Sequence, residues 1–329
     1  MATVIQNKTT QDKAFVRFGI QSLLEQLYAL TKEIDGVMKA DDPEYVHRMR
    51  VASRRIRTRL GLFGSCLPGK KAALWNRHFR KVTKALGAAR DTDVQIIFVE
   101  SFLAECTGRE KDGVKRLHLR LVQKRRRIQK KVCRAMTRIT GSGVIHDMEE
   151  TLRTALSPFL IEDDKGSPEY GLRAAREEIS ARLADMLGFV IYIHDPARKL
   201  ELHEMRIAVK HLRYSMEAFE PLYGKELKGF IKTTKTLQEM LGDIHDCDVW
   251  TEFLPEFYQE ERQRALEYTG GTRPAGRLKK GIECLEMDRA GFREERYHEF
   301  VSCWEENKEQ WKELLDVLAR QAQSDQTVA

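Results

Sequence analysis

Two stretches of the chain, residues 46–63 and 202–219, each place one histidine and three basic residues at intervals of three or four. At about 100° per residue, such side chains fall within an arc of about 80° on one face of a helix. Guanidinium and ammonium groups in a row offer hydrogen-bond donors to phosphate oxygens. The spacing therefore indicates helices that present a linear track of cations. Its members are His47, Arg50, Arg54 and Arg57 in the first stretch, and His203, Arg206, Lys210 and Arg213 in the second.

The opposite face of each stretch is apolar and predicts a helix packed against a core. A single cationic row of this kind is usually a solvated surface, but two copies in register favour a binding role. The packing positions are Met49, Ala52, Ile56, Leu60 and Phe63 in the first copy, and Met205, Ala208, Leu212, Met216 and Phe219 in the second.

A second cationic row lies in the next predicted helix, residues 74–86, which is followed by Gly87 and a further apolar helix through Leu103. Trp75, Phe79, Val82 and Leu86 form its apolar side. We assign to the same candidate site its basic residues Arg77, Arg80, Lys81 and Lys84, together with Lys232 and Lys235 in the second half.

Helical periodicity extends over the whole chain, which predicts an all-α protein. We expect a first helix over residues 14–37, a second from Pro43 to the region 64–69, and a basic helix that ends at Gly141–Gly143. Residues 161–168 read as a linker, after which the motifs restart. We therefore expect one domain over residues 1–325, with one repeat half at about 10–160, the other at about 168–325, and a frayed end after Arg320.

The composition argues for a folded protein in a reducing compartment. Hydrophobic residues make up 42% of the 329 residues, the formal net charge is +7, and the six cysteines show no CxxC spacing. The polar N-terminus resembles no signal peptide, and the longest apolar run, residues 186–193, is too short to span a bilayer. We expect a cytoplasmic protein that is neither secreted nor inserted in a membrane.

The duplicated HxxRxxx[RK]xxR helix, together with the RDTDV and HDCDV segments at 90–94 and 245–249, resembles the CHAD family, the conserved-histidine α-helical domain. The resemblance implies two pseudo-twofold-related four-helix bundles around a basic groove or pore. It also implies binding of inorganic polyphosphate without catalysis, through His47, Arg50, Arg54 and Arg57 in the first half and His203, Arg206, Lys210 and Arg213 in the second. The triphosphate-processing domain that precedes CHAD in many relatives would show β-rich alternation, and this sequence shows none, so we expect a stand-alone CHAD protein.

The second half carries fewer cations than the first, and we expect it to contribute less to binding. Arg54 corresponds to Lys210, Arg55 to His211, and Lys84 to Glu239.

Two other functions remain open. Asp91, Asp93, His245, Asp246 and Asp248 suggest a metal-dependent phosphohydrolase, although Arg90 replaces His245 in the first copy and a cation is a poor metal ligand. We favour helix-start caps or carboxylates that orient the arginine rows. The third function is a nucleic-acid-binding or scaffold protein, but the cationic faces carry no aromatic residues for base stacking. Non-specific binding of nucleic acid at low salt is expected.

The segment 115–138 contains no carboxylate, and its cations either extend the anion track or simply face water, of which we favour the second. The sequence as a whole predicts a non-enzymatic polyphosphate-binding protein without cofactor or metal, and an association with polyphosphate granules is left open. Reversing Arg50, Arg54 and Arg57 to Glu is expected to abolish binding.

Overall fold

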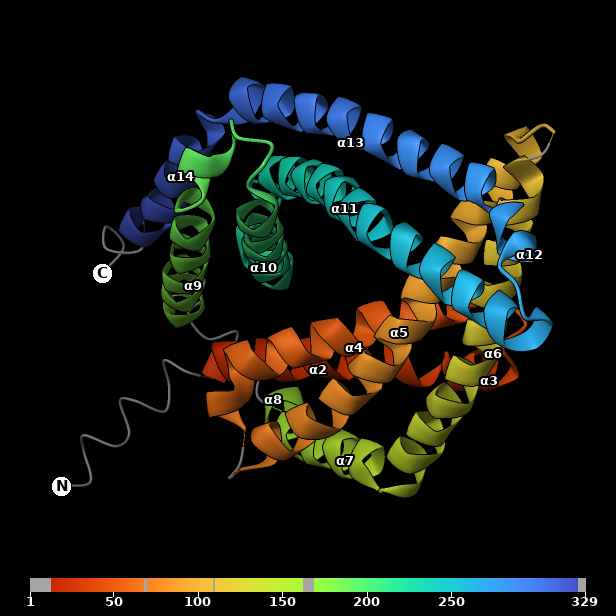
Figure 1. Ribbon diagram of the computed structural model, residues 1–329. Coiled ribbons are helices and arrows are strands. Elements are labelled where there is room, and N and C mark those ends of the chain that lie inside the picture. Colours follow the sequence, from red (N-terminus) through yellow and green to blue (C-terminus); the bar gives the residue numbers. More distant parts are fainter. Residues whose placement is uncertain (1–12, 68–69, 109, 162–168, 325–329) are drawn as a thin grey trace. The chain divides into compact units, whose positions relative to one another are not determined.

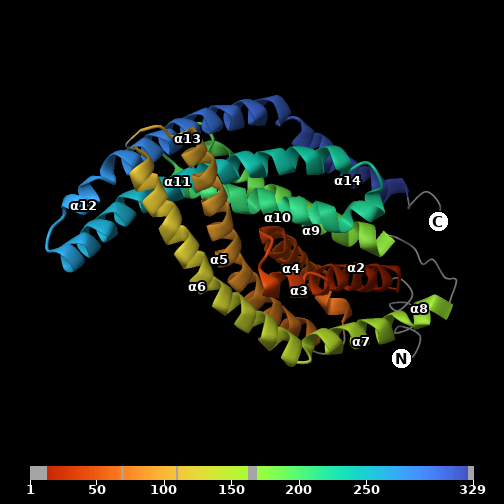
Figure 2. The same ribbon diagram turned by 90° about the vertical axis from the view of Figure 1, so that its right-hand side faces the viewer.

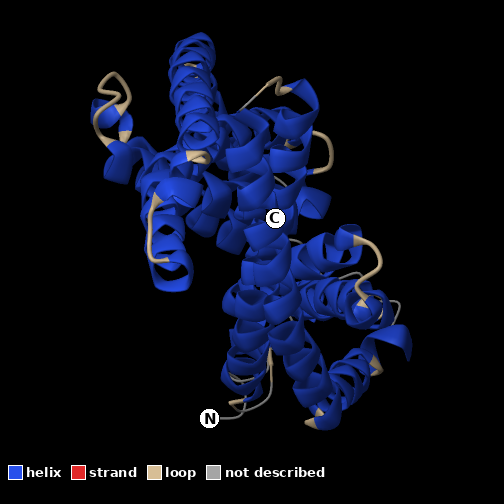
Figure 3. Cartoon of the chain, turned by 45° about the vertical axis from the view of Figure 1, so that its right-hand side comes forward, coloured by secondary structure: helices blue, strands red, loops and turns tan. Residues whose placement is uncertain are grey.

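The computed structural model describes residues 13–67, 70–108, 110–161 and 169–324. Within these ranges the chain forms helices and no strand (Figure 3). The predicted all-α class is therefore confirmed. No helix in the described ranges is long and apolar enough to cross a membrane.

The chain forms two compact units, each built from segments that are not contiguous in sequence. The first consists of residues 1–95 and 122–174, and the second of residues 96–121 and 175–329. Both unit boundaries inside the first half fall within long helices, α5 (Lys71–Glu105) and α6 (Glu110–Gly141). These two helices run side by side (Figures 1 and 2). Each of them supplies side chains to both units.

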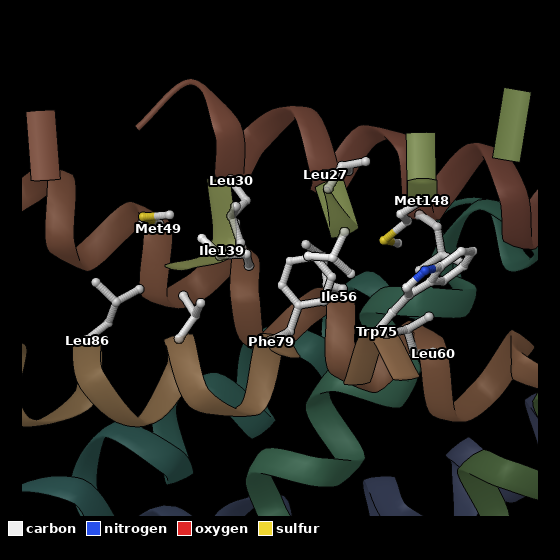
Figure 4. Packing of buried hydrophobic residues seen from close by; sticks show 14 of the residues in the cluster. Leu27, Leu30, Met49, Ile56, Leu60, Trp75, Phe79, Leu86, Ile139 and Met148 are labelled. Atoms are coloured by element: carbon white, nitrogen blue, oxygen red, sulfur yellow. The ribbon is translucent and has the colours of Figure 1, made fainter. Parts of the chain in front are cut away.

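The first unit packs its helices around one apolar core. Side chains of α5 and α6 meet those of the shorter helices in this core, with Trp75, Phe79 and Ile56 at its centre (Figure 4). Large aromatic and aliphatic side chains of this kind account for most of the stabilisation by burial. The shorter helices of the unit are α2 (Lys13–Thr31), α3 (Ile34–Lys39), α4 (Pro43–Phe63), α7 (Val144–Leu156) and α8 (Pro158–Ile161).

The second unit is built around the longest helix, α11. One of its clusters joins Val99 of α5 and Leu117 of α6 to Trp250 of α11 and Leu285 of α13. Tyr297 of α13 donates a hydrogen bond of 2.8 Å to the carbonyl of Ile193. The helices of this unit are α9 (Glu169–Leu187), α10 (Lys199–Tyr223), α11 (Lys228–Thr269), α12 (Arg273–Gly276), α13 (Lys279–Asn307) and α14 (Gln310–Ser324).

Helix α4, which carries the first cationic motif, begins and ends where the sequence indicates, and the basic helix α6 also ends where expected. The side chain of Asp42 caps α4 by accepting a hydrogen bond of 2.8 Å from the Glu44 amide, and Pro43 occupies the first turn. The helix ends at Phe63, just before Gly64, and α6 ends at Gly141. All the predicted packing positions of α4 and α10 are buried. Burial of the apolar face therefore fixes each helix in place, with its cationic row on the opposite face.

Some predicted helix boundaries are wrong. The first helix is interrupted at residues 32–33, where α2 ends and α3 begins, and α14 continues past Arg320 to Ser324. The break expected at Gly87 does not occur, because α5 runs through it as one helix of 35 residues. Likewise α11 continues for 42 residues, with Pro255 in its interior. The predicted linker lies largely outside the described residues.

Candidate polyanion-binding site

The cationic rows of α4 and α5 lie along one antiparallel helix pair, which we call the α4–α5 seam. At one end, Arg57 donates a hydrogen bond of 3.2 Å from Nε to Oδ1 of Asn76. One turn further, the hydroxyl of Thr83 donates to that of Ser53 at 3.1 Å. The seam therefore brings the first row of α4 beside the row of α5.

At the other end of the seam, cations and carboxylates alternate. Arg50 of α4 lies 3.6 Å from the carboxylate of Asp91, and Arg90 of α5 lies 3.2 Å from that of Glu44. The Asp91 side chain is 68% exposed, whereas that of Arg50 is 28% exposed. Asp91 thus pairs with Arg50 from the solvent side, in line with the sequence alternative that these carboxylates contact the arginine rows.

Gly87 provides the space in which the Arg50 side chain lies. A Cβ atom at position 87 would lie 3.9 Å from Nε of Arg50, which is ordinary contact distance. A longer side chain would occupy the place of the guanidinium group. The glycine that suggested a helix break therefore serves close packing between an arginine and a neighbouring helix.

Positive charges gather along the seam without full compensation. Burial lowers the pKa of Arg57, and the positive charge of Arg80 lowers it further. Burial also lowers the pKa of His47, and so does the nearby Arg90. Each of these groups would gain from an anion placed between the rows.

The two rows differ in exposure. The α4 residues His47, Arg50, Arg54 and Arg57 are half-buried, as are His203, Arg206, Lys210 and Arg213 of α10. The α5 and α11 rows reach further into solvent, since the exposed cations are Arg77, Arg80, Lys81, Lys84, Lys232 and Lys235.

The second unit contains a corresponding α10–α11 seam with a different balance of charge. Arg213 donates from Nε to Gln238 at 3.1 Å and from Nη1 to Glu217 at 2.5 Å, and its side chain is only 14% exposed. A Cβ atom at Gly242 would lie 3.5 Å from Nε of Arg206, so the arginine–glycine contact recurs. Because a carboxylate already neutralises Arg213, this seam has less charge to offer an anion.

Two histidines face each other at the head of the α10–α11 seam. The rings of His203 and His245 lie 4.1 Å apart, and Nδ1 of His203 is buried without a hydrogen-bond partner in the described part of the chain. Burial lowers the pKa of His245 to about 4, with further contributions from His203 and Arg206. At neutral pH, His245 is therefore uncharged where the first unit has Arg90.

The aspartates of the two repeated segments are not helix-start caps, because they lie in the interiors of α5 and α11. Asp93 accepts a hydrogen bond of 2.6 Å from Arg125 of α6, and Asp248 accepts one of 2.7 Å from Arg293 of α13. Burial raises the pKa of Asp93, which the Arg125 guanidinium opposes. Both carboxylates are buried, so they fasten long helices to each other.

No group of three or more His, Cys, Asp or Glu side chains in the described ranges is arranged to hold a metal ion. Two other places in the sequence have a histidine followed by an aspartate, His146-Asp147 and His194-Asp195, and both aspartates have partners within the protein. Asp147 accepts hydrogen bonds from Lys71 and Trp75, and Asp195 accepts one from the Ala197 amide. These contacts explain the aspartates without a metal.

Sequence reasoning did not assign two residues of the α4–α5 seam. Arg90 stands beside His47 and Glu44, and Asn76 holds Arg57. Arg90 could have been found by aligning the two copies, because it takes the position of His245, which faces the other motif histidine. The alignment of the two copies does not point to Asn76. In the second copy the corresponding arginine, Arg213, donates to Gln238, which does not lie at the position of α11 that aligns with Asn76.

The fold and the seams define an all-α protein with paired cationic helices. Residues 21–255 match the family model of the CHAD domain, and the chain therefore belongs to the CHAD family. None of the curated proteins compared with the chain is similar to it.

Two solved structures show the same fold. The crystal structure of the CHAD domain from the plant Ricinus communis is 24% identical, with a TM-score of 0.59 over 86% of this chain and 91% of that one. PptA from Streptomyces chartreusis is 16% identical, also with a TM-score of 0.59, over 89% of this chain and 99% of that one.

Proposed function

We propose that this protein binds inorganic polyphosphate, without catalysing a reaction, through the α4–α5 seam and to a lesser degree through the α10–α11 seam. The observation that carries the proposal is the gathering of like charges along the seam, where the positive charge of Arg80 lowers the pKa of Arg57 and that of Arg90 lowers the pKa of His47, each in addition to burial, beside the exposed basic row of α5. A bound polyanion relieves this repulsion and releases counterions.

Polyphosphate fits the seam better than nucleic acid does. The ligand carries a charge on each phosphate and nothing else to recognise, and the exposed row of α5 offers only basic side chains. Membership of the CHAD family supports the same ligand. We place the binding in the cytoplasm, where association with polyphosphate granules is a further part of the proposal.

The test reverses the exposed row and leaves the half-buried row in place. Arg50 and Arg57 make contacts inside the seam, so changing them to Glu would also disturb packing. Exposed side chains tolerate charge reversal with small effects on stability. The test variant therefore combines Arg77→Glu, Arg80→Glu, Lys81→Glu and Lys84→Glu.

We expect this variant to bind long-chain polyphosphate at least about tenfold more weakly near physiological salt, because four exposed contacts of about 0.5 kcal/mol each sum to about 2 kcal/mol. The measurement is calorimetry, with RNA of matched charge as competitor and circular dichroism to verify the fold. Phosphate release with and without divalent metal, measured in parallel, tests the absence of catalysis.

A matched control makes the same change in net charge elsewhere. It carries four exposed basic residues of the second unit changed to Glu, namely Arg262, Arg273, Arg277 and Lys280. Equal losses in the two variants would show that only the overall charge matters, and this would contradict a site at the α4–α5 seam. RNA that competes on equal terms would contradict the choice of ligand.

A further inference from the structure

The basic helix α6 divides into two parts that use their cations differently. In its first part, Arg116 and Arg120 donate to the buried carboxylate of Glu261 at 2.5 and 2.7 Å, and Arg125 donates to Asp93. Burial opposes the ionisation of Glu261, but these guanidinium groups and that of Arg264 lower its pKa. These three arginines are therefore explained by the packing of α6 against α5 and α11.

The second part of α6 has no such explanation. Six basic side chains between residues 126 and 138 are exposed, and none lies within ion-pair distance of a carboxylate in the described ranges of the chain. The opposite side of this helix is buried, with Val132, Met136 and Ile139 in the core of the first unit. The six cations therefore share the solvent side. They are Arg126, Arg127, Lys130, Lys131, Arg134 and Arg138.

Helix α13 shows that the fold does not require cations on such a face. Arg293 of α13 binds Asp248 of α11 as Arg125 of α6 binds Asp93 of α5, which gives the two helices a common register. Counted from the arginine, the positions that hold the six cations on α6 hold four glutamates, one histidine and one serine on α13, and all are exposed. The α13 residues are Glu294, Glu295, His298, Glu299, Ser302 and Glu306.

Both faces are solvated, so solubility alone would be served by either sign of charge. Six like charges on one helix face also repel each other and destabilise the helix. Six cations without a carboxylate among them, at positions where the matched helix carries no Lys or Arg and four glutamates, indicate a ligand of negative charge.

We propose that the outer face of α6, defined by the six cations from Arg126 to Arg138, is a second polyphosphate-binding surface, separate from the α4–α5 seam. This inference rests on the proposed function. The face extends for about 18 Å at 1.5 Å per residue, so it can follow an extended chain of phosphates. Residues 126–138 include no Phe, Tyr, Trp or His, and a nucleobase would therefore find no ring on this face to stack on.

The experiment counts binding sites with short polyphosphate chains of uniform length, each long enough for one surface only. We compare the wild-type chain with a variant carrying Arg126→Glu, Lys130→Glu, Lys131→Glu and Arg134→Glu. The α5 reversal and the control reversal at Arg262, Arg273, Arg277 and Lys280 undergo the same titration. All three variants change the net charge equally, so a difference among them reports location.

We expect the wild-type protein to bind at least two short chains, and the α6 variant to lose one while it keeps the chain bound at the seam. The α5 variant should show the converse loss, and the control should lose none. The slope of log K against log salt for a long chain should also become shallower in the α6 variant, by about 0.7 for each lost contact.

The outcomes separate the two proposals. An α6 variant with unchanged stoichiometry and salt slope overturns the second surface, while a loss in the α5 variant still supports the seam. Loss of all binding in the α6 variant overturns the separation into two surfaces. A wild-type chain that binds no polyphosphate overturns both. RNA binding that is lost in the α6 variant, while polyphosphate binding is unchanged, would assign this face to nucleic acid instead.

Discussion

The histidine of each repeated motif stands next to a different partner, and this difference decides how each unit responds to pH. His47 lies near the guanidinium group of Arg90, whereas the ring of His203 lies against that of His245. Burial lowers the pKa of both His47 and His245, in the latter case to about 4. The folded protein therefore keeps these rings neutral at a pH where the unfolded chain protonates them.

We predict that the free energy of unfolding decreases as the pH falls from 6.5 toward 4. The unfolded state binds protons that the folded state rejects, so stability is present above the histidine pKa of the unfolded chain and is lost below it. For one histidine the slope is at most about 1.4 kcal/mol per pH unit, and water near the half-buried ring reduces it. Urea denaturation at a series of pH values measures this slope.

Replacing His245 with Gln should make the decrease less steep, because its ring no longer contributes a proton-binding difference. His146 provides the matched control, since its side chain is 85% exposed and His146→Gln should leave the slope unchanged. If His245→Gln follows the wild-type profile, the ring is not held neutral by burial and by its cationic neighbours.

At the scale of helices, the sequence predicted which faces are buried but not how far α5 and α11 extend. The apolar stripe of α4 and that of α5, from Trp75 to Leu86, are buried as periodicity indicated. Periodicity is a local property, and a glycine within a helical pattern reads as a break because it costs about 1 kcal/mol relative to alanine. At Gly87, tertiary contact decides otherwise, since Arg50 of another helix lies against it.

The candidate site shows the same division between local and tertiary information. The spacing of basic residues placed Arg50 and Arg57 on one face of α4. It could not show that Asn76 and Asp91 would hold them, because those contacts depend on the register between α4 and α5. For the same reason the sequence left open whether Asp93 and Asp248 are helix caps or carboxylates that orient the arginine rows, whereas in the structure each pairs with an arginine of another helix, Arg125 and Arg293.

We predict that a small side chain at Gly87 stabilises the protein without changing affinity, whereas a large one weakens polyphosphate binding. Gly87→Ala should raise the free energy of unfolding by about 0.5–1 kcal/mol and leave polyphosphate affinity unchanged, because a methyl group fits beside Arg50 and alanine favours the helix. Gly87→Leu should weaken binding, because its side chain takes the place of the Arg50 guanidinium group. Urea denaturation and calorimetry measure the two effects.

Gly61 of α4 offers the matched control, since a Cβ atom there would meet nothing within 4 Å. Gly61→Leu should therefore leave affinity as it is. Equal binding by Gly87→Leu and the wild-type chain would show that the contact between Arg50 and α5 does not position this arginine for the ligand.

At the scale of the whole molecule, the two units share an arrangement but differ in charge. Both fasten their long helices with a buried aspartate–arginine pair, and both pack an arginine against a helix glycine. In the second unit, Glu217 holds Arg213, and Glu239 lies 3.7 Å from Lys235. The twofold relation between bundles and the groove between them remain predictions.

We predict that neutralising the row of α4 reduces polyphosphate affinity more than neutralising the row of α10. The two variants are Arg50→Gln, Arg54→Gln and Arg57→Gln in the first unit, and Arg206→Gln, Lys210→Gln and Arg213→Gln in the second. Arg57 has the neutral Asn76 and the cation Arg80 beside it, so its charge is available to a ligand. An anion that approaches Arg213 competes with a carboxylate already in place.

Calorimetry with long-chain polyphosphate at one fixed salt concentration measures both variants, and thermal unfolding verifies that each remains folded. Each variant removes three positive charges at corresponding positions, so the other serves as its control. Equal losses would mean that the intrahelical pair of Arg213 and Glu217 opens on binding, and a larger loss in the second unit would place the principal site there. A larger loss in the first unit is the expected result. It would show that the carboxylates of α10 and α11, and not the number of cations alone, determine how much affinity each repeated motif contributes.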